Sequence, residues 1–342
     1  MQKKANRRYG TVLLTLCFLM AGALFLSFFI GRYSITPEQA ASLLLESLFG
    51  TPSGIAGNVR KVFFNIRLPR VIGAFGVGAV LALSGSVYQS TLKNPMVSPD
   101  ILGATAGAGF GAALGLTLNC AGIAIQVLSF GFGLLAVSIT CAVSSVMGLR
   151  RNTTLTLVLT GMVMHALFQA LVSLIKYTAD PYSKLPAITF WLMGSLASMT
   201  WRALPLFLIS SLAGAIPLFL LRWKINLLSL SDEEALSIGV NVTALRRTII
   251  VCATLMTSSV VAVSGTIGWV GLIVPHVSRM LVGPDSRVQL PATLLLGGTY
   301  LLLVDDAARS MMAMEIPIGI LTALIGAPFF IGLIYRQRRV GT

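Results

Sequence analysis

Residues 71–92, VIGAFGVGAVLALSGSVYQSTL, form an uncharged segment between Arg70 and Lys93. Charged side chains are costly at the centre of a bilayer, and about 20 mainly apolar residues are enough to cross one. The segment therefore predicts a transmembrane helix. The whole chain has a matching composition, because 56% of its 342 residues are hydrophobic and only 11% are charged. Soluble domains carry about 25% charged residues, so a water-soluble enzyme is excluded.

Similar uncharged runs recur along the chain and set the number of predicted spans. Two of them are too long for one helix, since the run after Asp100 is broken at 119–122 and the run after Arg247 is broken around 265–271. We expect an all-α polytopic membrane protein, a single transmembrane domain over residues 1–342, with a partial helix in 185–201. The ten predicted spans are approximately 10–31, 71–92, 101–118, 123–149, 152–175, 203–221, 248–264, 267–280, 288–304 and 316–335.

The basic residues orient these spans. A net charge of +14 would suggest nucleic-acid binding in a soluble chain, but in a membrane protein Lys and Arg mark the cytoplasmic side. Both ends of the chain are basic, so an even number of spans places both termini in the cytoplasm. The predicted outer side nevertheless keeps a basic group, Arg60, Lys61, Arg67, Arg70 and Arg309. Two explanations stay open: side chains that reach the lipid interface, or docking of an acidic extracytoplasmic protein.

A short motif occurs twice in the sequence. ALSGSV at 82–87 is matched by AVSGTI at 262–267, and a proline follows each glycine at the same distance, Pro95 and Pro275. On the predicted topology the copies lie near opposite faces of the membrane, so the repeat is inverted. Inverted repeats are typical of transporters whose pathway lies between the two halves. A chance match of so short a motif is the alternative.

The sequence carries no catalytic signature. It has no GxxxxGK[ST] phosphate loop, HExxH, GxSxG or paired-carboxylate site, so we expect neither an enzyme nor ATP binding by this chain. The predicted spans also lack a series of acids or lysines that could relay protons. His165 and His276 are expected to pack or to make local hydrogen bonds. Cys17, Cys120, Cys141 and Cys252 are scattered singly, so no metal site is predicted.

A polar segment between Lys224 and Arg246 is predicted to be cytoplasmic. Ser231, followed three residues later by Glu234, forms a capping box, acidic residues favour the positive start of a helix, and Gly239 favours its end. The pattern predicts a short helix of about seven residues. Such a helix is either a solvated part of a loop or a docking element for a soluble partner.

Motifs in a fixed order then run along nearly the whole chain. They are RLPR at 67–70, Gly85 with Gln89, Asn94-Pro95, Pro99, Leu102-Gly103, the segment 233–240, Gly268 to Gly271 with Pro275-His276 and Arg279, and the segment 316–330. Together they resemble the FecCD family, the permeases for iron chelates and vitamin B12 in ABC importers. The resemblance implies the BtuC-like type II permease fold with about ten transmembrane helices and an inverted repeat.

The resemblance also implies partners and residue roles. The partners are a second permease subunit around a central pathway, two ATPases that bind ATP and Mg, and a periplasmic or lipid-anchored substrate-binding protein. Arg67, Arg70 and Arg309 are implied to grip acidic residues of the binding protein, and Thr153 and Thr154 to lie at the cytoplasmic gate. The segment 231–239 is implied to be the coupling helix that contacts the ATPase. Its residues are Ser231, Asp232, Glu233, Glu234, Ala235, Ser237 and Gly239.

The expected function is that of a permease subunit in the cell (inner) membrane. It would receive an iron chelate, a ferric siderophore or haem, and move it inward by alternating access driven by the partner ATPases. No cofactor is expected on the chain itself. Cobalamin import is the alternative, and a secondary transporter driven by an ion gradient is the rival class.

Overall fold

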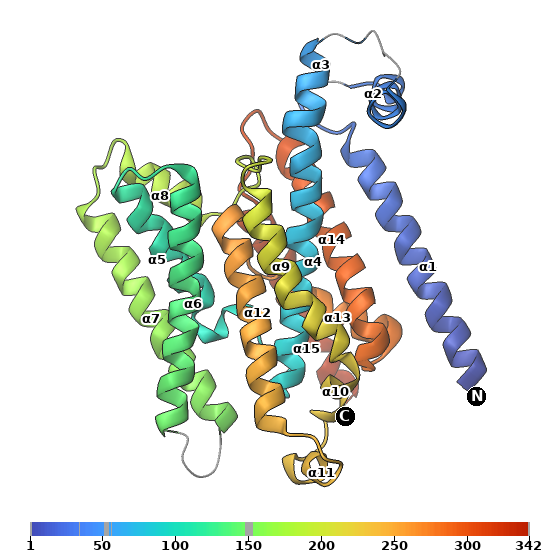
Figure 1. Ribbon diagram of the computed structural model, residues 1–342, viewed down its shortest axis with the longest axis vertical. Coiled ribbons are helices and arrows are strands. Elements are labelled where there is room, and N and C mark those ends of the chain that lie inside the picture. Colours follow the sequence, from blue (N-terminus) through green and yellow to red (C-terminus); the bar gives the residue numbers. More distant parts are fainter. Residues whose placement is uncertain (1, 34, 51–54, 56, 148–152, 341–342) are drawn as a thin grey trace.

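The computed structural model describes residues 2–33, 35–50, 55, 57–147 and 153–340, and that part of the chain is helical without strands. Figure 1 shows the long helices running along one axis, with α2 and α3 at one end of the molecule and α11 at the other. The helices are α1 (Gln2–Ser27), α2 (Pro37–Phe49), α3 (Gly57–Val62), η1 (Phe63–Arg67), α4 (Leu68–Thr91), η2 (Pro99–Leu102), α5 (Ala104–Thr117), α6 (Gly122–Met147), α7 (Thr153–Thr178), α8 (Lys184–Leu192), α9 (Leu204–Leu220), α10 (Arg222–Leu227), α11 (Asp232–Ser237), α12 (Val242–Ser264), α13 (Val270–Val282), α14 (Ser286–Ser310) and α15 (Ile318–Val340).

Six of these helical segments are long and apolar enough to cross a membrane. They are Tyr9–Ser27, Gly57–Thr91, Gly122–Met147, Thr154–Thr178, Val242–Ser264 and Ser286–Ser310. Three shorter apolar helices, α9, α13 and the 318–333 part of α15, accompany them. The chain is therefore a multi-pass membrane protein, and each of the ten predicted spans falls on one helix. The count of ten crossings and the side on which the termini lie stay predictions.

Helix α4, which contains the segment 71–92, lies at the centre of the packing. Most of its side chains are buried, and it packs against α12, α13 and α14. Close approach depends on glycine at two places, because a Cβ on Gly85 would overlap the carbonyl oxygen of Gly271 and one on Gly78 would overlap that of Gly297. Small residues at such contacts let neighbouring backbones approach where lipid gives no hydrophobic drive between helices.

The two copies of the repeated motif lie near the C-terminal ends of helices that run in opposite directions (Figure 1). The end of α4 reaches the start of α11, since Lys93 Nζ donates to Leu230 O at 2.6 Å, whereas α12 starts just after α11 and leads away from it. The copies differ locally, because α4 continues past Gly85 while α12 ends at Gly265 with φ +67°. An inverted arrangement is thus present, as the motif predicts.

Helix α13 is short and contains Pro275. Proline has no N–H, so the carbonyl four residues earlier, that of Gly271, lacks its usual donor. Gln89, buried at the end of α4, supplies a substitute: its Nε2 donates to Gly271 O at 3.4 Å and to Leu272 O at 3.2 Å. The predicted partial helix in 185–201 is α8, which ends at Leu192 before Gly194 turns the chain with φ +75°.

Candidate functional site

Six charged side chains meet at the end of the molecule that holds α2 and α3. Three are the arginines of the predicted docking set, and three are carboxylates from the last turns of α14 and the loop before α15. We call this group the arginine cluster: Arg67, Arg70, Arg309, Asp305, Asp306 and Glu315. A cavity of about 180 Å³ lies beside it and is lined by the three arginines, Glu315 and the 31–33 segment after α1.

Arg70 is held by two carboxylates at once. Its Nε lies 3.0 Å from Asp305 Oδ2 and its Nη2 lies 2.9 Å from Asp305 Oδ1. The outer fork of the guanidinium donates to Glu315, with 3.0 Å from Nη1 to Oε1 and 2.9 Å from Nη2 to Oε2. Asp305 is fully buried, whereas the Glu315 side chain is 29% exposed. Bidentate pairs of this kind are stronger than neutral hydrogen bonds and fix the geometry of both partners.

Arg309 and Arg67 bind the end of α1 and the segment that follows it, and so connect both to the arginine cluster. Arg309 Nη2 donates to Asp306 Oδ1, and it reaches Ser27 O and Ser27 Oγ at 2.7 Å each. Arg67 donates to the backbone carbonyls of Phe28 and Tyr33. The end of α1 and the segment after it are therefore held to η1 and α14 by charged side chains.

Arg67, Arg70 and Arg309 are not free on the surface of this chain, because they are only 3%, 6% and 5% exposed. The physical reason is that the chain supplies its own carboxylates, Asp305, Asp306 and Glu315, none of which was predicted from the sequence as a site residue. A buried guanidinium needs such partners. Arg60 is exposed, and it too has a partner, with Nη1 2.5 Å from Glu46 Oε1. The docking role of the three arginines stays a prediction.

The opposite end of the molecule carries α11. The capping box is formed as predicted: Ser231 N donates to Glu234 Oε2 at 2.9 Å, and Glu234 N donates to Ser231 Oγ at 3.2 Å. The backbone N–H of Ser231 and the hydroxyl beside it hold the pKa of the Glu234 carboxyl below its usual value. The helix spans six residues, and Gly239 follows it with φ +83°.

The residues around α11 divide into anchors and exposed groups. Ala235 is buried in the core, and Asp232 Oδ1 lies 3.5 Å from Arg246 Nη2 and 3.8 Å from Lys93 Nζ. These contacts hold α11 against α12 and the end of α4. Glu233 is exposed, as is Ser237. Two apolar side chains next to them, Leu236 and Ile238, are 67% and 57% exposed. Neither residue is among those predicted from the sequence, although their place beside a capping box was a usable signal.

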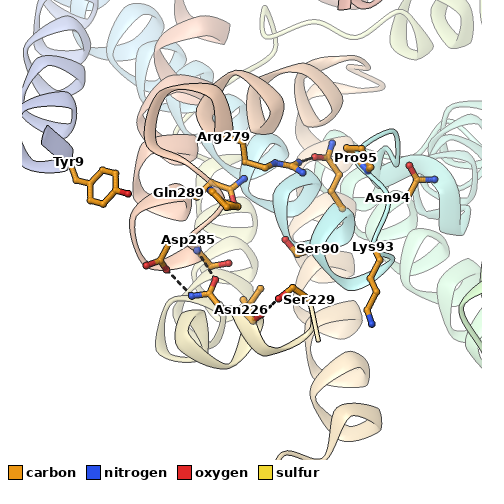
Figure 2. A pocket seen from close by; sticks show the side chains of 14 residues that line it. Tyr9, Ser90, Lys93, Asn94, Pro95, Asn226, Ser229, Arg279, Asp285 and Gln289 are labelled. Carbon is orange, nitrogen blue, oxygen red and sulfur yellow. Dashed lines mark hydrogen bonds between the residues drawn. The ribbon is translucent and has the colours of Figure 1, made fainter. Parts of the chain in front are cut away.

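A cavity of about 590 Å³ lies in the same half of the molecule (Figure 2). Its walls come from the end of α4 and the loop after it, from α10, from the connection between α13 and α14, and from Tyr9 of α1. Arg279 Nη2 donates to Gln89 Oε1, so the residue that caps the break in α13 also lines this cavity. Across it, Asn226 Nδ2 donates to Asp285 Oδ1 at 2.7 Å.

The predicted gate lies at the start of α7. Thr153 begins this helix, but its side chain and residues 148–152 lie outside the described part of the chain. Thr154 is half-buried in the first turn. The gate assignment of these two threonines stays a prediction.

A comparison with protein-family models matches residues 18–336 to the FecCD transport family. The chain belongs to the FecCD transport family. The match covers the arginine cluster, the α11 segment and both copies of the repeat, and it confirms the resemblance on which their roles were predicted. FecCD proteins are membrane permease subunits of ABC transporters, so the chain is the permease of an ABC importer, with ATPase and substrate-binding partners implied.

Individual FecCD relatives carry different substrate names. The molybdate import system permease protein of Haemophilus influenzae is 43% identical over 97% of this chain and 98% of its own length. A probable iron chelatin transport system permease protein of Helicobacter pylori is 43% identical over 82% of this chain and 84% of its own. A solved structure of a putative metal-chelate type ABC transporter, in an inward-facing conformation, is 40% identical with a TM-score of 0.82 over 96% of this chain and 99% of that chain.

Proposed function

We propose that this FecCD protein is the permease of an ATP-driven importer for iron chelates, in the cell (inner) membrane with both termini in the cytoplasm. The observation that carries the proposal is the separation of two candidate partner surfaces: α11, with exposed Glu233, Leu236 and Ile238, lies at one end, and the cavity beside the buried arginine cluster lies at the other. An importer that takes substrate from one soluble protein and energy from another needs such surfaces on opposite faces.

In this proposal a substrate-binding protein docks at the end that holds the arginine cluster, and two ATPases with bound ATP and Mg seat on α11. Two permease copies, or one copy and a paralogue, enclose the pathway. Closure of the ATPases moves α11, and the pair switches the open side of the pathway, with Thr153 and Thr154 at its cytoplasmic gate. A switch between the outward-open and inward-open conformations needs ligands that bind the two with different affinity. In this proposal ATP and the loaded binding protein are those ligands.

The substrate proposal has two candidates. Siderophore or haem iron is supported by the iron chelatin relative and by the metal-chelate type neighbour, both at 40% identity or more. Molybdate is the second, because the molybdate relative matches 97% of this chain. Cobalamin is the further alternative within the family. Membership of an ABC permease family favours ATP-driven import over the ion-gradient rival.

Reconstitution tests the proposal. Proteoliposomes with the permease and its ATPases, supplied with the binding protein and a radiolabelled ferric siderophore, haem, molybdate or cobalamin, should take up one ligand only when ATP is present on the ATPase side. Uptake should stop without the binding protein or with an ATPase that cannot hydrolyse ATP. Uptake by the permease alone under an ion gradient would contradict the proposal, and uptake of molybdate alone would replace the iron-chelate assignment.

A further inference from the structure

The arginine cluster has equal numbers of positive and negative side chains, and one of its carboxylates, that of Glu315, is free to move away from the arginines. Its three guanidiniums face three carboxylates, those of Asp305, Asp306 and Glu315. Asp305 and Asp306 are 0% and 3% exposed and lie within α14. Glu315 comes from the loop between α14 and α15, and its side chain is 29% exposed. Of the three carboxylates, only Glu315 combines a loop position with access to water.

The cavity beside the cluster is suited to a second carboxylate. It measures about 180 Å³, and its lining includes Arg67, Arg70, Arg309 and Glu315. Arg309 is 5% exposed, and its Nε has no hydrogen-bond partner among the described residues, with Asp305 Oδ2 at 3.7 Å. Arg32 is exposed at the cavity rim and adds a further positive charge. When Glu315 swings out, two carboxylates remain against three guanidiniums, and the vacated fork of Arg70 matches an incoming carboxylate.

We propose that the fork of Arg70 held by Glu315 is a carboxylate-acceptor site, and that an acidic side chain of the docking substrate-binding protein displaces Glu315 from it. The inference rests on the proposed function and names the residue that competes with the partner. Glu315 keeps the buried guanidinium paired while the outer face is empty, which avoids the cost of an unpaired buried charge. Docking then exchanges one carboxylate for another, so the partner gains Arg70 without leaving a buried charge unpaired.

The test measures binding of the substrate-binding protein encoded with this permease to the permease–ATPase complex in nanodiscs. Glu315→Gln removes the competing charge and should tighten binding about tenfold, the scale of a close charge-pair coupling. Glu315→Asp keeps the charge but shortens the reach to Arg70, so it should tighten binding as well. Glu46→Gln removes a carboxylate paired with Arg60 on the same face and serves as the control for net charge; it should change affinity less than about twofold.

The outcomes distinguish failure of the Glu315 exchange from failure of docking at this face. Equal tightening by Glu315→Gln and Glu46→Gln, or no tightening by either Glu315 variant, overturns the inference. Arg70→Gln separates the two ideas, because it removes the guanidinium fork itself. If Arg70→Gln weakens binding while the Glu315 variants do not tighten it, the docking face stands and only the exchange is wrong. If neither Arg70→Gln nor the Glu315 variants change affinity, docking at this face fails too.

Folded complexes are identified by their basal ATP hydrolysis and by a single size-exclusion peak. If the Glu315→Gln protein does not fold, the Glu315→Asp protein is used for the binding measurement in its place.

Discussion

At the scale of single residues, the contact between Gly85 and Gly271 sets how closely α4 and α13 pack. The nearest atom to an added Cβ on Gly85 belongs to the backbone of α13, which cannot move aside as a flexible side chain can. The same contact lies one turn before Gln89, which donates to the Gly271 carbonyl left open by Pro275. The carbonyl group of Gly271 therefore takes part both in the close packing of α4 on α13 and in the hydrogen bond that replaces the one missing at Pro275.

Gly85→Ala is expected to destabilise the folded permease by about 1–3 kcal/mol or more, the usual cost of overpacking a filled core. The measurement is the thermal melting temperature of the purified protein in detergent. Gly22→Ala in α1 is the matched control, because a Cβ there meets nothing within 4 Å, and its melting temperature should stay near that of the wild type. A Gly85→Ala protein that melts with the control would show that α4 and α13 are not closely packed.

Residue roles could be predicted from the sequence where their partners are near in the chain. Ser231 and Glu234 are three positions apart, so the capping box was readable and its geometry is as predicted. Arg70 and Asp305 are 235 positions apart, and no local pattern shows that they pair. The place of Arg70 at the start of the helix over 71–92 was therefore predictable, whereas its burial against Asp305 was not. Pairings between distant helices depend on the packing of the whole bundle.

At the scale of elements, α11 is a short helix whose two ends are satisfied locally and whose exposed side combines acidic residues with the apolar Leu236. Its start is held by the capping box, and Asp232 and Ala235 fix it to the body of the protein. Leu236 and Ile238 then point outward without cover from this chain. Exposed apolar side chains on a fixed element are typical of a docking surface, and burial of a leucine is worth roughly 1.5–3 kcal/mol.

Leu236→Ser should therefore weaken the association of the ATPase with the permease by roughly tenfold or more, because that apolar burial is lost. Folding should be little affected, since Leu236 is already 67% exposed in this chain. Co-purification and binding of the ATPase at graded concentrations measure the effect. Ser237→Ala, which alters the next exposed residue, should retain wild-type association. Equal ATPase affinity for Leu236→Ser would place the ATPase contact elsewhere on the cytoplasmic side.

A second prediction for the same helix concerns coupling. Replacement of Glu233 and Glu234 by alanine should uncouple ATP hydrolysis from transport, because the first loses an exposed charge and the second loses the capping box that holds the first turn. In proteoliposomes, hydrolysis should continue while uptake falls. Normal uptake by this double variant would remove α11 from the coupling pathway.

At the scale of the whole molecule, α4 joins the two candidate sites. Its 24 residues extend about 36 Å, from Arg70 in the arginine cluster to the turn that carries Lys93. Lys93 Nζ donates to Leu230 O at 2.6 Å and lies 3.8 Å from Asp232, so it contacts both the loop that leads into α11 and the first turn of that helix. Between these ends α4 is buried against α12, α13 and α14. In the proposed importer, a helix that contacts both ends would offer a route by which docking of the binding protein influences α11, and this route needs a direct test of coupling.

Lys93→Met should interrupt this route while leaving both docking surfaces intact. Methionine keeps an unbranched side chain at a turn position with φ +51°, but it cannot donate to Leu230 or pair with Asp232. We expect the loaded binding protein to bind with unchanged affinity and to stimulate ATP hydrolysis several-fold less than it does in the wild type, since a coupling of about 1 kcal/mol corresponds to about fivefold. Arg287→Met removes another partly exposed basic side chain in the same half, one paired with Asp285 at 3.9 Å and away from α11, and should keep full stimulation. Full stimulation in Lys93→Met would mean that the signal does not depend on the hydrogen bond and the ion pair of Lys93 and reaches α11 by another route, such as α12 or the partner subunit.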